Sequence, residues 1–149
     1  MSELDLSQVP FGTEITADEV LETLGFLDDW EDRYGYIIDL GKQLPSFPES
    51  MQTDDRLVRG CQSQVWLETD YDTDEKRLRM AVDSDALIVR GLAAIVLAAL
   101  NNRSPEEVAQ YDMEDYFEQM DLLRHISPIR GNGLRAMVQR IRNTAEQYT

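Results

Sequence analysis

The chain has one cysteine and one histidine, and these two residue types limit the chemistry that its side chains can perform. Cys61 cannot close an internal disulfide, and one cysteine with one histidine cannot supply a Cys-rich zinc site. Cys61 is therefore either a nucleophile that acts as its thiolate or a structural cysteine that is buried as a small apolar side chain.

The residues around Cys61 have a mixed chemical character. Arg56, Arg59 and Gly60 precede it, and the polar run 62–64 separates it from the apolar residues that follow. A polar interruption between two apolar segments is typical of a loop tip. The sequence thus predicts a thiol held in a loop, and this local chemistry leaves both the reactive and the buried interpretation open.

The stretch 60–66, Gly-Cys-Gln-Ser-Gln-Val-Trp, resembles the sulfur-acceptor loop of the SufE/CsdE family, small bacterial proteins that accompany cysteine desulfurases. Four more segments resemble the family in the same order, namely 30–34, 41–45, 83–92 and 127–134. Segments 10–13 and 41–45 are closer to the CsdE branch, whereas the cysteine loop is closer to SufE. The resemblance therefore leaves the cognate desulfurase open.

The resemblance implies a function for Cys61. The chain would take persulfide sulfur from a pyridoxal-phosphate (PLP) cysteine desulfurase, SufS-like or CsdA-like, stimulate that enzyme, and pass the sulfur to an iron-sulfur scaffold complex. The PLP would belong to the partner, so the chain would be an accessory protein without cofactor or metal rather than an independent enzyme. The residues implied for the sulfur loop or the partner interface are Arg59, Gly60, Gln62, Ser63, Gln64, Trp66, Asp85 and Arg130.

This role requires a loop that reaches into the active site of another protein and also shelters a persulfide. We expect Gly60 to supply the hinge of this loop, and an apolar pocket to shelter the sulfur in the free protein.

The alternative from another class is a thiol-dependent enzyme, such as an acyl-transfer hydrolase, with His125 as the base for Cys61. The sequence does not supply the distance between Cys61 and His125, and a lone histidine is more often structural.

A scaffold for iron-sulfur clusters is disfavoured because clusters need about four thiolate ligands and the chain has one cysteine. Residues 70–74 resemble the opening of a calcium loop, but Glu75 and Ala81 stand where a glycine and a bidentate glutamate are needed.

Composition limits the partners of the chain. It has 29 acidic and 14 basic residues, a formal charge of −15, which is repelled by nucleic acid and by anionic lipid. We therefore expect no nucleic-acid or membrane partner, but a partner with a basic docking face.

The first five residues lack the pattern of a secretory signal, and the longest apolar run, 92–100, is far below the roughly 20 residues that span a bilayer. The sequence predicts a cytoplasmic protein, whose reducing surroundings suit a free thiol.

Hydrophobic periodicity predicts one α+β domain over residues 1–149, with 1–15 as an extended lead-in. A small antiparallel sheet of about three strands would pack against several helices, and the resemblance implies a SufE/IscU-like fold. Helices are expected from about Ala17, at 28–43, at 86–100, from Pro105, at 113–120 and at 133–147. Strands are expected at 65–69 and 78–82, with a third short strand before Cys61.

Single residues define several of these elements. Thr16 and Ser104 have the spacing of helix N-caps, and Ser84 is expected to cap the helix at 86–100. Gly91 lies inside that helix, where it costs about 1 kcal/mol relative to alanine, so we expect another element to approach it closely.

Overall fold

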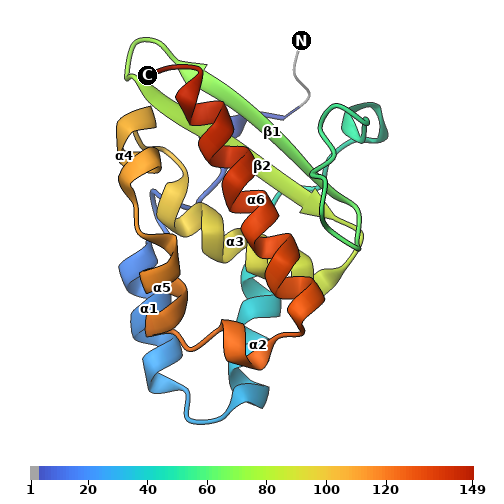
Figure 1. The fold of residues 1–149 in the computed structure, drawn as a ribbon, viewed down its shortest axis with the longest axis vertical. Coiled ribbons are helices and arrows are strands. Elements are labelled where there is room, and N and C mark those ends of the chain that lie inside the picture. Colours follow the sequence, from blue (N-terminus) through green and yellow to red (C-terminus); the bar gives the residue numbers. More distant parts are fainter. Residues whose placement is uncertain (1–3) are drawn as a thin grey trace.

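Six α-helices and one β-hairpin are arranged around a central apolar helix in the computed structural model, which describes residues 4–149 (Figure 1). The helices are α1 (Ala17–Phe26), α2 (Trp30–Gly41), α3 (Leu87–Leu100), α4 (Pro105–Gln110), α5 (Met113–Gln119) and α6 (Pro128–Glu146). The strands are β1 (Val65–Asp72) and β2 (Arg77–Ser84), and the 3-10 turns are η1 (Leu6–Gln8), η2 (Glu49–Met51) and η3 (Leu123–His125). The predicted α+β class is confirmed.

The two strands form an antiparallel hairpin whose register pairs Val65 with Ser84 at one end and Asp72 with Arg77 at the other. The acidic turn between them is closed by the Asp72 carboxylate, which accepts two backbone N–H groups of the turn at 3.0 Å each. The hairpin places the end of β2 beside the start of β1, next to the cysteine loop.

The predicted strand count was too high, because the segment before Cys61 is not a strand in the described part of the chain. Leu57 and Trp66 form an isolated antiparallel bridge instead. Two backbone hydrogen bonds flank it, from the Val58 N–H to the Val65 carbonyl at 2.8 Å and from Leu67 to Arg56 at 2.9 Å. Pairing stops there because the chain turns away into the cysteine loop.

Helix α3 is the centre of the core, and residues 91–100 are all buried. It packs against β2, α1, α2 and α6, and α6 crosses in front of the sheet in Figure 1. The expected close approach at Gly91 is confirmed, since a Cβ there would lie 2.3 Å from the Ile37 carbonyl oxygen of α2. A Cβ on Gly41 would lie 2.6 Å from the Gly91 nitrogen, so two glycines set the spacing of α2 and α3.

Several helix starts follow the local capping signals. Thr16 accepts the Glu19 N–H, and Ser104 forms a complete capping box with Glu107, as predicted. Helix α2 begins at Trp30, two residues later than expected, because the Asp29 side chain caps it.

Two starts differ from the sequence prediction. Helix α6 begins at Pro128 rather than Gly133, since the Ser127 hydroxyl caps it and proline suits the first helical position. Ala86, not Ser84, is the N-cap residue of α3, although the Ser84 hydroxyl accepts the Ala86 N–H at 3.2 Å.

Residues 1–3 of the expected lead-in lie outside the described residues, and residues 4–15 contain the turn η1 and pack onto the core. Val9 and Phe11 are buried, and the Phe11 carbonyl accepts the Asn101 side-chain amide at 2.9 Å. This segment contributes to the core.

No helix among residues 4–149 has the length and apolar character that crossing a membrane requires.

Candidate functional site

Cys61 lies in a six-residue loop, 59–64, which we name the cysteine loop. The Val58–Val65 hydrogen bond closes its base. Gly60 has φ +90°, a conformation that side-chain-bearing residues rarely adopt, and a Cβ there would lie 3.1 Å from the Ala136 Cβ of α6. Both the backbone angle and the contact with α6 therefore require glycine directly before the cysteine.

The Cys61 thiol is half-buried and faces the first turns of α6. Its Sγ donates a hydrogen bond to the Gly133 carbonyl at 3.4 Å. Burial raises the pKa of Cys61, because the charged thiolate is poorly solvated there. In this conformation the sulfur is a neutral, sheltered thiol and needs a change of surroundings to become nucleophilic.

A cavity of about 70 Å³ adjoins the thiol. Its walls come from the cysteine loop, α3 and α6, and the lining residues are Cys61, Gln62, Ser63, Val89, Leu92, Ile129, Arg130, Gly133, Leu134 and Met137. This space leaves room for a second sulfur atom beside the thiol, since a cavity of about 10–15 Å³ already holds a water. The mostly apolar walls from α3 and α6 suit an uncharged sulfur better than an ion.

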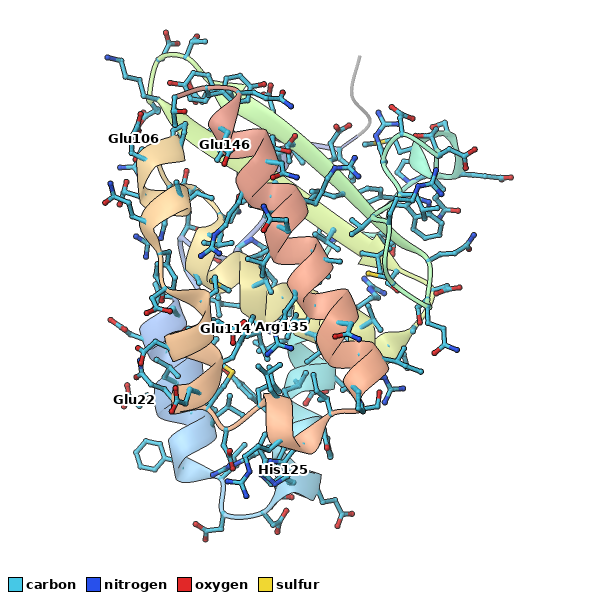
Figure 2. The ribbon with its side chains drawn as sticks, viewed as in Figure 1. Glu22, Glu106, Glu114, His125, Arg135 and Glu146 are labelled. Atoms are coloured by element: carbon cyan, nitrogen blue, oxygen red, sulfur yellow. The ribbon has the colours of Figure 1, made fainter. Side chains whose placement is uncertain are left out.

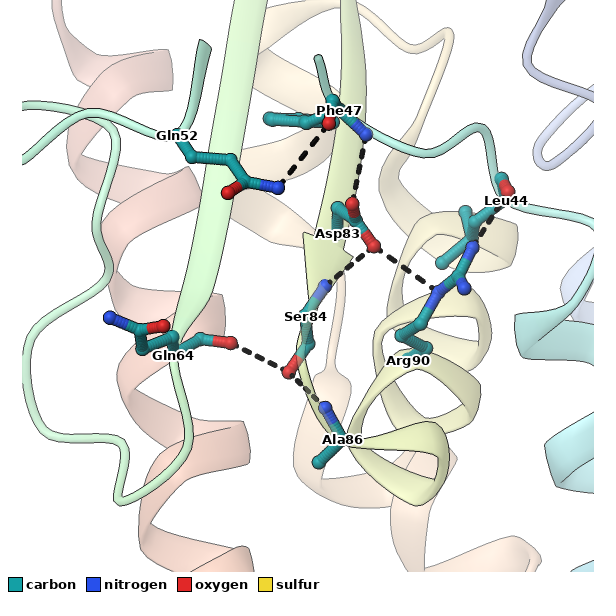
Figure 3. Close-up of polar contacts among 8 residues, drawn as sticks. All are labelled: Leu44, Phe47, Gln52, Gln64, Asp83, Ser84, Ala86 and Arg90. Atoms are coloured by element: carbon teal, nitrogen blue, oxygen red, sulfur yellow. Dashed lines mark hydrogen bonds and ion pairs between the residues drawn. The ribbon is translucent and has the colours of Figure 1, made fainter. Parts of the chain in front are cut away.

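The last residue of the loop, Gln64, is held by the end of β2. Its N–H donates to the Asp85 carboxylate at 3.1 Å. Its carbonyl accepts the Ser84 hydroxyl at 2.6 Å (Figure 3). Asp85, which the resemblance implies for the sulfur loop or the partner interface, is exposed, and its carboxylate holds this end of the loop.

Asp83 links the same strand end to the chain around η2 and α3. The buried carboxylate accepts the Phe47 N–H and the Ser84 N–H at 2.8 Å each, and pairs with Arg90 at 3.3 Å (Figure 3). Arg90 also donates to the Leu44 carbonyl at 2.9 Å. One buried ion pair thus joins three segments directly behind the loop end.

The other expected site residues divide into two groups. Gln62, Ser63 and Arg130 line the cavity together with Cys61. Arg59 is exposed and makes no hydrogen bond or ion pair within residues 4–149, and Trp66 is buried in β1. The α3 and α6 wall of the cavity was not expected from the sequence. Gly133 gave no usable signal, because beside Gly131 it is typical of a loop and only the structure places it inside α6.

His125 is used structurally in η3. Its ring stacks on Trp30 with centroids 4.0 Å apart and planes at 13°, and its Nδ1 lies 3.0 Å from the Asp121 carbonyl oxygen. The His125 carbonyl accepts the Tyr34 hydroxyl. Figure 2 shows His125 at η3 beside α2. It is not among the residues that line the described cavity at Cys61, so the geometry gives no support to a Cys-His pair.

Among residues 4–149, no group of three or more histidine, cysteine or acidic side chains is placed to hold a metal ion.

Two comparisons with known proteins agree on one family, and a third shows the fold. The profile described as "SufE: Fe-S metabolism associated domain" matches residues 18–145. An uncharacterized SufE-like protein of Rhizobium meliloti (strain 1021) is 46% identical over 131 residues, covering 87% of this chain and 94% of the relative. Another, from Rhizobium etli, is 47% identical and covers 87% and 88%. The solution structure of a hypothetical protein from Thermus thermophilus has a TM-score of 0.72 at 20% identity, covering 89% and 94%, and shows the shared fold.

Proposed function

Because this chain belongs to the SufE family, whose domain is associated with Fe-S metabolism, we propose that it accepts persulfide sulfur on Cys61 from a cysteine desulfurase. The observation that carries the proposal is the position of Cys61. Its loop contains a glycine at φ +90°, and its thiol adjoins a cavity of about 70 Å³ whose α3 and α6 walls are mostly apolar. A site of this kind suits a sulfur that must be exposed for transfer and sheltered afterwards.

The transfer is an exchange at sulfur with no net oxidation. The Cys61 thiolate attacks the terminal sulfur of the donor persulfide and forms a new S–S bond. The S–S bond of the donor breaks and the donor cysteine leaves as a thiolate, which takes up the proton that Cys61 released on ionising. Because burial raises the Cys61 pKa in the free protein, the partner's site must supply the surroundings in which the thiol ionises.

The surface around the cavity fits a protein partner. Leu87 and Ile129 are 58% and 53% exposed, although both are large and apolar. Arg59 stands two residues before Cys61 and Arg130 lines the cavity, and within the described residues neither guanidinium pairs with a carboxylate. In a chain of charge −15, exposed apolar side chains and two unpaired cations near the cavity are features of a docking surface.

Cys61 would act as an accessory acceptor rather than as an independent enzyme. The PLP would reside in the partner desulfurase, SufS-like or CsdA-like, and an iron-sulfur scaffold complex would receive the sulfur. We assign the protein to the cytoplasm and treat it as one domain. The single cluster of buried apolar residues supports the one-domain assignment.

Stimulation of a desulfurase tests the proposal. Alanine formation from cysteine is measured with a SufS-like and a CsdA-like enzyme, with wild-type protein or Cys61→Ser. The wild type should accelerate one of them at least severalfold, and Cys61→Ser should not, because it cannot remove the persulfide. Equal stimulation by both proteins would refute sulfur acceptance at Cys61.

A further inference from the structure

The two ends of the cysteine loop are held by side chains outside it. On the first side, Arg140 of α6 reaches back to the segment before the loop. Its Nη1 donates to the Leu57 carbonyl at 3.1 Å and its Nη2 to the Asp55 carbonyl at 2.6 Å. One guanidinium therefore fixes two carbonyls of a segment that has only a single bridge to β1.

On the second side, Ser84 connects the loop to helix α3. Its hydroxyl donates to the Gln64 carbonyl at 2.6 Å and accepts the Ala86 N–H at 3.2 Å (Figure 3). The side chain is buried, at 7% exposure, so water does not replace these bonds easily. The last loop residue and the first turn of α3 thus share one hydroxyl.

Both attachments lead to helices that form the cavity wall. Arg140 follows Gly133 by about two turns on α6, and Ala86 precedes Val89 by three residues at the start of α3. Because the loop ends are attached to these helices, their position relative to the cavity stays the same while the Cys61 sulfur leaves the cavity and returns.

We propose that Arg140 and Ser84 are positioning residues that fix the two ends of the cysteine loop, so that only residues 59–63 move when Cys61 leaves its cavity. The inference rests on the proposed sulfur acceptance and names the residues that control it. Gly60 is the hinge within the moving part, since it alone among residues 59–63 has a positive φ. Arg140 and Ser84 touch neither the sulfur nor the cavity and act through the loop.

Alkylation of Cys61 by iodoacetamide in the free protein is the first test. Arg140→Met keeps the apolar stem but loses both donors, and Ser84→Ala loses the shared hydroxyl. Because a net hydrogen bond changes a local equilibrium by about fivefold to tenfold, alkylation should accelerate about tenfold in each variant. Amide hydrogen exchange should increase at residues 57–58 in the first variant and at 64–65 in the second, while β2 residues 78–82 stay protected.

Matched controls separate positioning from a general loss of stability. Arg142 lies two residues after Arg140 on the same helix, but it donates to the Tyr111 carbonyl at 2.5 Å and not to the segment before the loop. Arg142→Met should leave the alkylation rate within twofold of the wild type. Ser84→Thr keeps the hydroxyl and should restore slow alkylation.

Kinetics with the desulfurase give a readout that stability alone would not change. The maximal rate of sulfur acceptance should fall about tenfold in Arg140→Met and Ser84→Ala, while the half-saturating concentration stays within twofold, because Leu87 and Ile129 remain in place.

Unchanged alkylation and exchange in both variants, or equal acceleration in Arg142→Met, would overturn the inference. These two assays use no desulfurase. Failure of sulfur acceptance would therefore be seen separately, in the Cys61→Ser comparison.

Discussion

Gly133 determines how deep the Cys61 sulfur can sit. A Cβ on Gly133 would lie 3.3 Å from Sγ, 3.6 Å from the Cys61 Cα and 3.7 Å from its Cβ. The first distance is shorter than ordinary van der Waals contact, so Gly133→Ala must push the thiol outward by a few tenths of an ångström. The added methyl also occupies the space beside Sγ that a second sulfur would need.

The energetic terms of Gly133→Ala nearly cancel in the folded protein. Alanine is favoured over glycine inside a helix by about 0.8–1 kcal/mol. Weakening the bond from the thiol to the Gly133 carbonyl removes about 0.5–1 kcal/mol. We therefore expect the free energy of unfolding to change by less than about 1 kcal/mol, whereas Cys61 is displaced from its shelter.

Alkylation and persulfide lifetime measure this displacement. Iodoacetamide should modify Cys61 about tenfold faster in Gly133→Ala, and a Cys61 persulfide should be lost severalfold faster in aerobic buffer. Gly131→Ala is the matched control on the same helix, since a Cβ there would meet only Leu123 Cδ2 at 3.8 Å. Equal alkylation rates in the two variants would refute the reasoning that Gly133 sets the depth of the sulfur.

Four other changes address the hinge, the buried ion pair, the histidine and the ionisation of the thiol. Gly60→Val should lower the free energy of unfolding by about 1–2 kcal/mol, because φ is +90°, and should slow sulfur acceptance in a desulfurase assay. Asp83→Asn should cost about 3 kcal/mol in urea unfolding, since Arg90 keeps a buried charge without its partner. His125→Ala should lose an aromatic stack worth about 1 kcal/mol, seen as a lower Tm, with unchanged sulfur acceptance. Alkylation of Cys61 should rise with pH around a midpoint above that of free cysteine, because burial raises its pKa and only the thiolate reacts.

Each of these expectations has an outcome that would contradict it. Unchanged sulfur acceptance in Gly60→Val would show that Gly60 is not the hinge of the loop. A stable Asp83→Asn protein would show that the ion pair is not needed for stability. Loss of sulfur acceptance in a folded His125→Ala protein would favour the alternative, a thiol-dependent enzyme with His125 as the base for Cys61. A midpoint for alkylation below that of free cysteine would mean that the resting thiol is activated rather than suppressed.

The parts of the fold that depend on local signals could be predicted from the sequence. Thr16 and Ser104 cap helices where their spacing indicates, because a cap is made within one turn. The hairpin and the apolar helix α3 follow from hydrophobic patterns that are local as well. The loop position of Cys61 was visible for the same reason, as a polar run between two apolar ones.

The parts that were missed depend on contacts between distant segments. The start of α6 was placed too late because Gly131 and Gly133 look like a loop, yet Gly133 is in the helix and makes room for Cys61, 72 residues earlier. The expected third strand reduces to one bridge at Leu57, held in part by Arg140, 83 residues later. Periodicity does not carry such information, because it describes only neighbours along the chain.

The most direct test of sulfur acceptance is the intact mass of the protein after incubation with an active desulfurase and cysteine. Wild-type protein should gain about 32 Da, one sulfur atom, the gain should disappear with reductant, and Cys61→Ser should gain nothing. No gain in the wild type with either a SufS-like or a CsdA-like enzyme, each shown to be active in the same tube, would contradict the account and leave Cys61 as a buried structural cysteine.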